Sequence, residues 1–100
     1  MGKKDIRKNF RVSVFKRDYN RCAVCMTSTN ITAHHITDRN DIPNGGYVKE
    51  NGISLCEVCH ILAEQFHISD GEHWEPGFHP DDLYSIVDSS KELAFKRAEQ

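Results

Sequence analysis

Hydrophobic positions along the first half of the chain change from helical to strand-like spacing. Apolar side chains at 12, 15 and 19 within residues 9–19 favour a short helix, although those at 10, 12 and 14 alternate as in a strand. Residues 30–36 (NITAHHI) and 52–55 (GISL) are each predicted to be a strand. Turn residues fill 42–47 (IPNGGY) between them, so the two strands should form a hairpin with a long loop.

The second half of the chain is predicted to be mainly helical. Residues 57–67 (EVCHILAEQFH) contain no helix breaker and predict a helix. A loop over 69–80 should end where Pro80, followed by two aspartates, begins another helix. Ser89 and Glu92 form a capping-box pattern that would open a last helix through residues 92–100.

The length and hydropathy of the chain indicate one small domain over residues 1–100. A core of this size alone gives marginal stability. No apolar run approaches the roughly 20 residues that span a bilayer. The first residues, MGKKDI, lack the hydrophobic region of a secretory signal. We therefore expect a cytoplasmic protein with no membrane partner.

Charge is distributed unevenly along the chain. Residues 1–21 carry eight basic and two acidic side chains, a formal charge of +6, whereas residues 22–100 carry −8. A basic segment on an acidic body can approach phosphate groups with one face. A solvated, lysine-rich terminus would explain the same charges, so this pattern permits nucleic-acid binding without requiring it.

Four cysteines form two pairs of the same spacing, Cys22–Cys25 and Cys56–Cys59. Disulfides are rare in the cytoplasm, whereas paired Cys-x2-Cys segments are typical of tetrahedral zinc sites. Such a shell has no open position, so the zinc would be structural and would add stability that a small core lacks. A redox pair or unrelated buried thiols are alternatives that the repeated spacing disfavours. Thirty residues separate the pairs, more than the roughly 15–20 of a simple zinc ribbon, and they include His34 and His35.

Residues 33–36 (AHHI), 50–56 (ENGISLC) and 56–60 (CEVCH) resemble the HNH endonuclease motif of the ββα-metal nucleases. The resemblance covers about residues 12–64, and the paired cysteines are similar to a zinc-stapled subgroup found in small phage and bacterial HNH proteins. It implies an α+β fold, a small ββα-metal (His-Me finger) domain with a structural zinc site and flanking helices. The basic N-terminal segment would cover residues 1–21, the zinc knuckles and core 22–67, and a loop with C-terminal helices 68–100.

The resemblance also implies an activity, the metal-dependent hydrolysis of DNA phosphodiester bonds by nicking or double-strand cleavage. His35 would be the general base, and His34 and His60 would bind a catalytic divalent cation such as Mg²⁺, Mn²⁺, Ni²⁺ or Zn²⁺. Asn51 would orient the His35 imidazole or fix the loop that carries it, although in some family members it touches the metal. The residue types suit this chemistry, because imidazole titrates near neutral pH and a cation offsets the charge of the phosphate.

Three questions stay open at the level of sequence. Adjacent strand residues point to opposite faces, so His34 and His35 reach one site only if the strand bulges or ends there. Glu64 and His67 share a helix face with His60 and could complete the metal shell, but an exposed amphipathic face is the favoured interpretation. The alternative function is a non-catalytic zinc module that binds nucleic acid or protein. RNA or branched DNA as substrate, and a homodimer or other phage proteins as partners, remain open as well.

Overall fold

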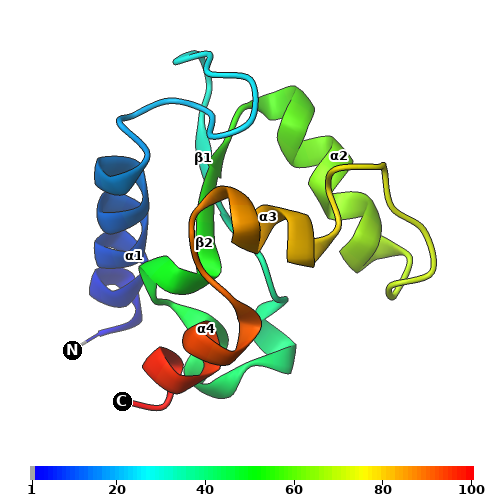
Figure 1. Cartoon of the computed structure of the whole chain (residues 1–100). Helices are drawn as coiled ribbons and strands as arrows, with labels where there is room; N and C mark the ends of the chain where they lie inside the picture. The colour runs from blue at the N-terminus through cyan, green and yellow to red at the C-terminus, as the bar shows by residue number, and fades with distance from the viewer. Residues whose placement is uncertain (1) are drawn as a thin grey trace.

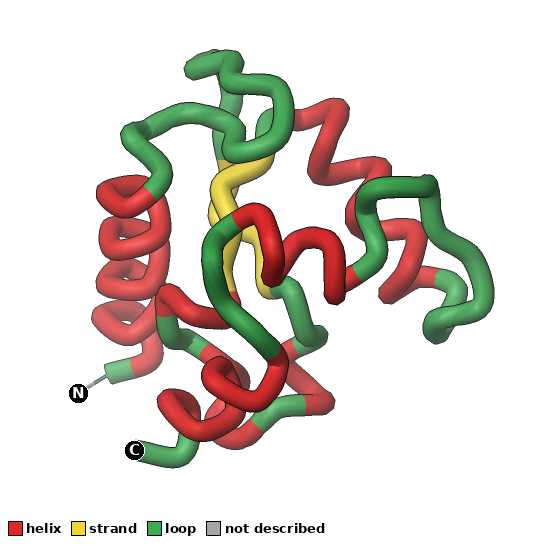
Figure 2. The backbone as a smooth tube through the Cα atoms, in the orientation of Figure 1, coloured by secondary structure: helices red, strands yellow, loops and turns green. Residues whose placement is uncertain are grey.

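A computed structural model describes residues 2–100, so Met1, the first residue of the predicted domain, lies outside it. A short antiparallel strand pair lies in the middle, with α1 on one side and α2 on the other (Figure 1). Figure 2 shows how little of the backbone is strand. The predicted α+β class is confirmed. The helices and strands, in chain order, are α1 (Lys3–Arg17), β1 (Thr32–His35), β2 (Gly52–Leu55), α2 (Glu57–Ile68), α3 (Pro80–Ile86) and α4 (Lys91–Ala98).

The two strands form the predicted hairpin, with His34 opposite Ile53 and His35 opposite Gly52. All four residues of β2 are buried, because α1 and α2 each contact both strands. The long connection contains three short 3-10 turns, η1 (Arg39–Asp41), η2 (Pro43–Gly46) and η3 (Lys49–Asn51). Gly46 has a φ of 63°, and a Cβ there would lie 2.6 Å from Asn51 Nδ2, so both backbone conformation and space require glycine.

Helix α1 begins at Lys3, several residues earlier than the hydrophobic pattern predicts, and it packs directly on the start of β2. A Cβ on Gly52 would collide with the side chains of Phe10 and Val14, which are the buried face of the helix. At the end of α1, Arg17 donates hydrogen bonds to the Lys49 and Gly52 carbonyls. The close approach and these bonds fix α1 against the hairpin.

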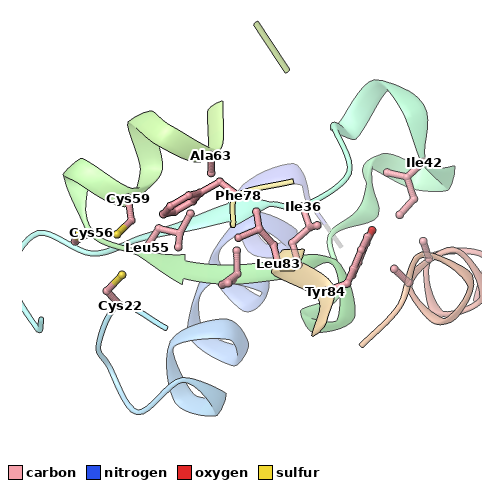
Figure 3. Close-up of a cluster of buried hydrophobic side chains, with 13 residues drawn as sticks. Cys22, Ile36, Ile42, Leu55, Cys56, Cys59, Ala63, Phe78, Leu83 and Tyr84 are labelled. Carbon is pink, nitrogen blue, oxygen red and sulfur yellow. The ribbon is translucent and has the colours of Figure 1, made fainter. Parts of the chain in front are cut away.

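The main hydrophobic core lies between the hairpin and the helices that follow it (Figure 3). Ile36, Ile53 and Leu55 are fully buried there, and α3 contributes Leu83 and Tyr84. Helix α4 adds small buried side chains rather than large ones, so it lies close to η2 and η3. No helix within residues 2–100 has both the length and the apolar character needed to cross a membrane.

The starts of the last two helices test the capping predictions. Helix α3 begins at Pro80 as predicted, and His79 caps it by accepting a hydrogen bond from the Asp81 amide at 3.0 Å. The capping box proposed for Ser89 is wrong. Ser90 is the N-cap of α4, with its Oγ accepting from the Leu93 amide at 3.1 Å. Ser89 instead donates to the Glu50 carbonyl at 2.8 Å, a long-range bond that outweighs the local pattern.

Candidate functional site

The four cysteines come together at one end of the hairpin. The Sγ atoms of Cys22, Cys25, Cys56 and Cys59 all lie within 4.8 Å of one another, and all four cysteines are free of disulfides. Figure 3 shows the side chains of Cys22 and Cys59 pointing toward each other. The first knuckle is tied to β2 because the Ala23 amide donates to the Ser54 carbonyl at 2.8 Å. Two segments distant in sequence thereby bring together four sulfur donors.

The electrostatics of this cluster favour a bound cation. Burial and the neighbouring thiols raise the pKa of Cys59. Burial also acts to raise the pKa of Cys22, but backbone hydrogen bonds to its sulfur outweigh that effect and lower the pKa to about 7. Four sulfurs this close cannot all ionise unless a cation offsets their charge. The donor set and the repeated knuckle spacing fit tetrahedral Zn²⁺, with no position left for substrate.

A second cluster of metal-ligating side chains lies between β1 and α2. Oε1 of Glu64 lies 3.2 Å from His34 Nδ1 and 3.3 Å from His60 Nε2. The potential ligand atoms of these three residues all lie within 4.8 Å of one another. Sequence reasoning favoured an exposed position for Glu64; its i, i+4 spacing from His60 was the signal that it belongs to this cluster. His34, from a different element, completes the group.

The protonation states of this cluster also fit a divalent cation. A hydrogen bond from His34 is the main cause that lowers the pKa of Glu64 to about 2. Burial lowers the pKa of His34, even though the Glu64 carboxylate acts to raise it. At neutral pH the carboxylate is therefore ionised and the imidazole neutral, which are the forms that bind metal.

His35 points away from this cluster, toward α1. Its ring stacks on Phe10 at a centroid distance of 4.5 Å and meets the Tyr47 ring edge-on at 4.8 Å. Burial is the main cause that lowers the pKa of His35 to about 4, so the imidazole is neutral at pH 7. Because β1 ends at His35, both histidines still border one cavity of about 310 Å³. Adjacent strand residues point to opposite faces, and His34 and His35 can border one cavity because the strand ends there, not because it contains a bulge.

Asn51 is fully buried and holds the loop rather than the His35 ring. Its Oδ1 accepts from the Thr37 amide at 2.9 Å and from the Tyr84 hydroxyl at 2.7 Å. Its Nδ2 donates to the Thr37 and Gly46 carbonyls at 3.1 and 3.3 Å. These four bonds use the whole hydrogen-bonding capacity of a carboxamide, so nothing remains for a metal or for His35. Of the roles considered for Asn51, this geometry matches loop fixation.

His67 has a different place from Glu64. Its Nε2 lies 3.1 Å from the backbone carbonyl of His35, and because a carbonyl only accepts, that nitrogen must donate. The His67 ring also stacks beside that of His34 at 5.3 Å. His67 therefore ties α2 to the end of β1. Sequence reasoning missed Tyr47 and Tyr84, whose contacts join distant segments and leave no local pattern.

Comparison with known proteins agrees with this geometry. Residues 22–66 match a family model described as HNH endonuclease. Over this segment, the chain is similar to HNH endonucleases. No curated protein and no solved structure matches the chain.

The match begins at the first cysteine knuckle and ends within α2. It confirms the resemblance drawn from residues 33–36, 50–56 and 56–60. Similarity to HNH endonucleases over this segment supports nuclease activity, implies a nucleic-acid substrate and is consistent with use of a divalent metal. The cluster of four cysteines is in keeping with a zinc-stapled subgroup.

Proposed function

We propose that this HNH domain is a metal-dependent endonuclease that hydrolyses phosphodiester bonds in DNA. One observation carries the proposal: His35 and the His34–His60–Glu64 cluster border the same cavity, but the two histidines point to opposite sides of the strand end. In phosphoryl transfer the attacking and leaving oxygens lie roughly in line on opposite sides of phosphorus. A base on one side and a metal site on the other suit that requirement.

His35 is the proposed general base. Its imidazole is neutral at pH 7, because burial lowers its pKa to about 4, and it can therefore accept a proton from water. A bound phosphodiester is an anion and would raise that pKa toward neutrality, which would make the base stronger when substrate is present. Phe10 and Tyr47 hold the ring from two directions.

His34, His60 and Glu64 are the proposed ligands of the catalytic cation. Two imidazoles and one carboxylate bind Mn²⁺, Ni²⁺ or Zn²⁺ more readily than Mg²⁺, which prefers oxygen ligands. A cation bound there supplies positive charge to the phosphate oxygens and the leaving oxygen. The four cysteines would hold a separate Zn²⁺ whose role is structural.

Other residues of the cavity position substrate and base. Arg39, which lines the same cavity, offers positive charge to a phosphate. Asn51 fixes the loop that follows β1, and His67 holds the carbonyl of His35. We assign no catalytic step to Asn51; it acts through the backbone that it braces.

Cleavage of supercoiled plasmid DNA tests this function. With Mn²⁺ or Mg²⁺ added, His35→Ala should lower the nicking rate at least about 100-fold, the usual contribution of a general base. His73→Ala is the matched control, because His73 is exposed and lies far along the chain in the loop after α2. Zinc content and the far-ultraviolet circular dichroism spectrum should be unchanged in both variants. Nicking by His35→Ala at the wild-type rate would exclude His35 as the base. Absence of wild-type cleavage with every divalent metal would favour the non-catalytic zinc module.

A further inference from the structure

A second cavity adjoins the proposed active site on the side of α1. It has a volume of about 350 Å³ and lies between that helix and β1. His35 and its strand neighbour Ala33 border both this cavity and the metal-side cavity, so the two cavities adjoin at the proposed base. The second cavity contains none of the three proposed ligands of the catalytic cation.

The rim of this cavity is positively charged. Arg7 and Arg11 are four residues apart on α1, are both exposed and line the cavity together. No acidic side chain is among the described residues that line it. Two guanidinium groups on one helix face match the charge and geometry of a phosphate.

The positive charge continues past His35 into the active-site cavity. Hydrogen bonds from Arg39 and then from Arg7 lower the pKa of Tyr47, so both arginines lie near its hydroxyl. Arg39 lines the metal-side cavity and Arg7 the second cavity. Positive groups are therefore present on both sides of His35.

The walls of the second cavity are mainly apolar and aromatic. Phe15 and Ile31 line it and are half-buried, and Tyr47, whose ring contacts that of His35, lines it as well. Phe10 is buried beneath and meets Tyr47 edge-on at 5.7 Å. Aromatic and apolar walls under a basic rim are typical of sites that hold a nucleotide of a single strand, with the base against the walls and the phosphate on the rim.

We propose that the cavity between α1 and β1 is a nucleotide subsite, which binds the DNA strand next to the phosphate that is cleaved. Arg7 and Arg11 bind the neighbouring phosphate, while Phe15 and Ile31 contact the adjoining base or sugar. This inference rests on the proposed function for its position in the substrate, since it places the neighbouring nucleotide one step along the strand from His35.

Binding without cleavage tests the subsite separately from the activity. Every protein carries His60→Ala to prevent turnover and is zinc-loaded, and the probe is fluorescein-labelled twelve-residue oligothymidine followed by fluorescence anisotropy. Arg7→Gln with Arg11→Gln should weaken binding at least tenfold. It should also reduce the slope of log affinity against log salt by about 0.7, the value for one phosphate of a single strand that is no longer neutralised.

Lys8→Gln with Lys16→Gln is the matched control. It removes the same charge from α1 at exposed positions that do not line the cavity, and should weaken binding less than threefold. Equal weakening by both pairs would overturn the subsite and leave only general attraction to α1. Because no cleavage is measured, that result would leave the proposed nuclease function untouched. Conversely, if the plasmid assay showed no cleavage, a difference in DNA binding between the arginine and the lysine double variants would still support the subsite.

An abasic oligomer of the same length tests the contact with the base. The protein that carries only His60→Ala should bind oligothymidine about tenfold more tightly than the abasic strand, in line with the usual effect of stacking. Phe15→Ala should reduce that preference, with circular dichroism used to verify its fold. Equal affinity of the unaltered cavity for the two oligomers would overturn the assignment as a nucleotide subsite.

Discussion

The two clusters of metal-ligating side chains share one helix but differ in almost every other respect. Cys56 and Cys59 flank the start of α2, His60 follows directly and Glu64 comes one turn later. Cys56 and Cys59 are buried, whereas the side chains of His60 and Glu64 are 36% and 35% exposed. The sulfur cluster has four donors and no room for substrate, while the imidazole–carboxylate cluster has three donors and opens into a cavity.

Residues expected to stabilise the fold and residues expected to take part in catalysis therefore lie next to each other along a single helix. The sulfur cluster ties residues near the end of α1 to the start of α2, so its loss removes a constraint on the fold. The second cluster joins only β1 and α2, which are already held by the hairpin and the core. Changes only about one helical turn apart should therefore have different consequences, one mainly for stability and the other mainly for activity.

Cys56→Ser is the change with the largest expected effect on stability. Removing one thiolate from a four-sulfur shell should lower the free energy of unfolding by on the order of 5 kcal/mol, because structural zinc binding contributes directly to folding. Thermal unfolding and the zinc content by mass spectrometry measure it. His60→Ala, four residues later, is the comparison. It should lower stability by only about 1 kcal/mol and should mainly reduce activity. If Cys56→Ser left the melting temperature unchanged, the structural role of the sulfur cluster would be refuted.

Asn51→Ala tests whether the hydrogen bonds of Asn51 to the loop after β1 stabilise the fold. The change leaves buried groups of Thr37, Gly46 and Tyr84 without their present partner, which should lower the free energy of unfolding by about 2–4 kcal/mol. Tyr84→Phe removes only one of these bonds to Asn51 and should cost about 1 kcal/mol. Denaturant unfolding distinguishes the two. A smaller loss for Asn51→Ala than for Tyr84→Phe would contradict the network.

The pH dependence of stability is a smaller effect and is specific to His35. Burial lowers its pKa in the folded state from 6.5 to about 4, so between these values the unfolded chain binds more protons. The stability contributed by the neutral ring is present above about pH 6.5 and is lost as the pH falls toward 4. Because the ring is partly solvated, solvent screening should limit the loss between pH 7 and pH 5 to about 1 kcal/mol.

His35→Phe supplies the reference for that measurement. Phenylalanine keeps a ring against Phe10 but cannot titrate, and both proteins lose zinc-thiolate bonds to acid in the same way. Unfolding by guanidinium at pH 7 and pH 5 should show a steeper loss for the wild type. Parallel losses in the two proteins would show that His35 is not held neutral by the fold.

Sequence patterns predicted the elements that local residues determine. The strand over 52–55 has the bounds of β2, and the helix over 57–67 differs from α2 by one residue at its end. Turn chemistry placed the loop at 42–47, where Asn44 and the two following glycines adopt positive φ. These outcomes follow from propensities that act over a few residues.

Features that depend on distant segments could not be predicted in the same way. The pairing of Asn51 with Tyr84 spans 33 residues, and the bond between Ser89 and Glu50 spans 39. Helical spacing placed Glu64 on the same face as His60, but only the approach of β1 shows that His34 joins these two residues. The cavity beside α1 likewise depends on how closely that helix packs against Gly52, and no local sequence pattern predicts this contact.

Counting bound metal ions tests the central claim, that this small fold holds two distinct metal sites, most directly. Native mass spectrometry of zinc-loaded protein titrated with Mn²⁺ should show one tightly held Zn²⁺ and one additional divalent ion in the wild type. Glu64→Ala and His60→Ala should each retain the Zn²⁺ and lose the additional ion. A wild type that never takes up a second ion, or variants that still bind it with unchanged affinity, would contradict the account.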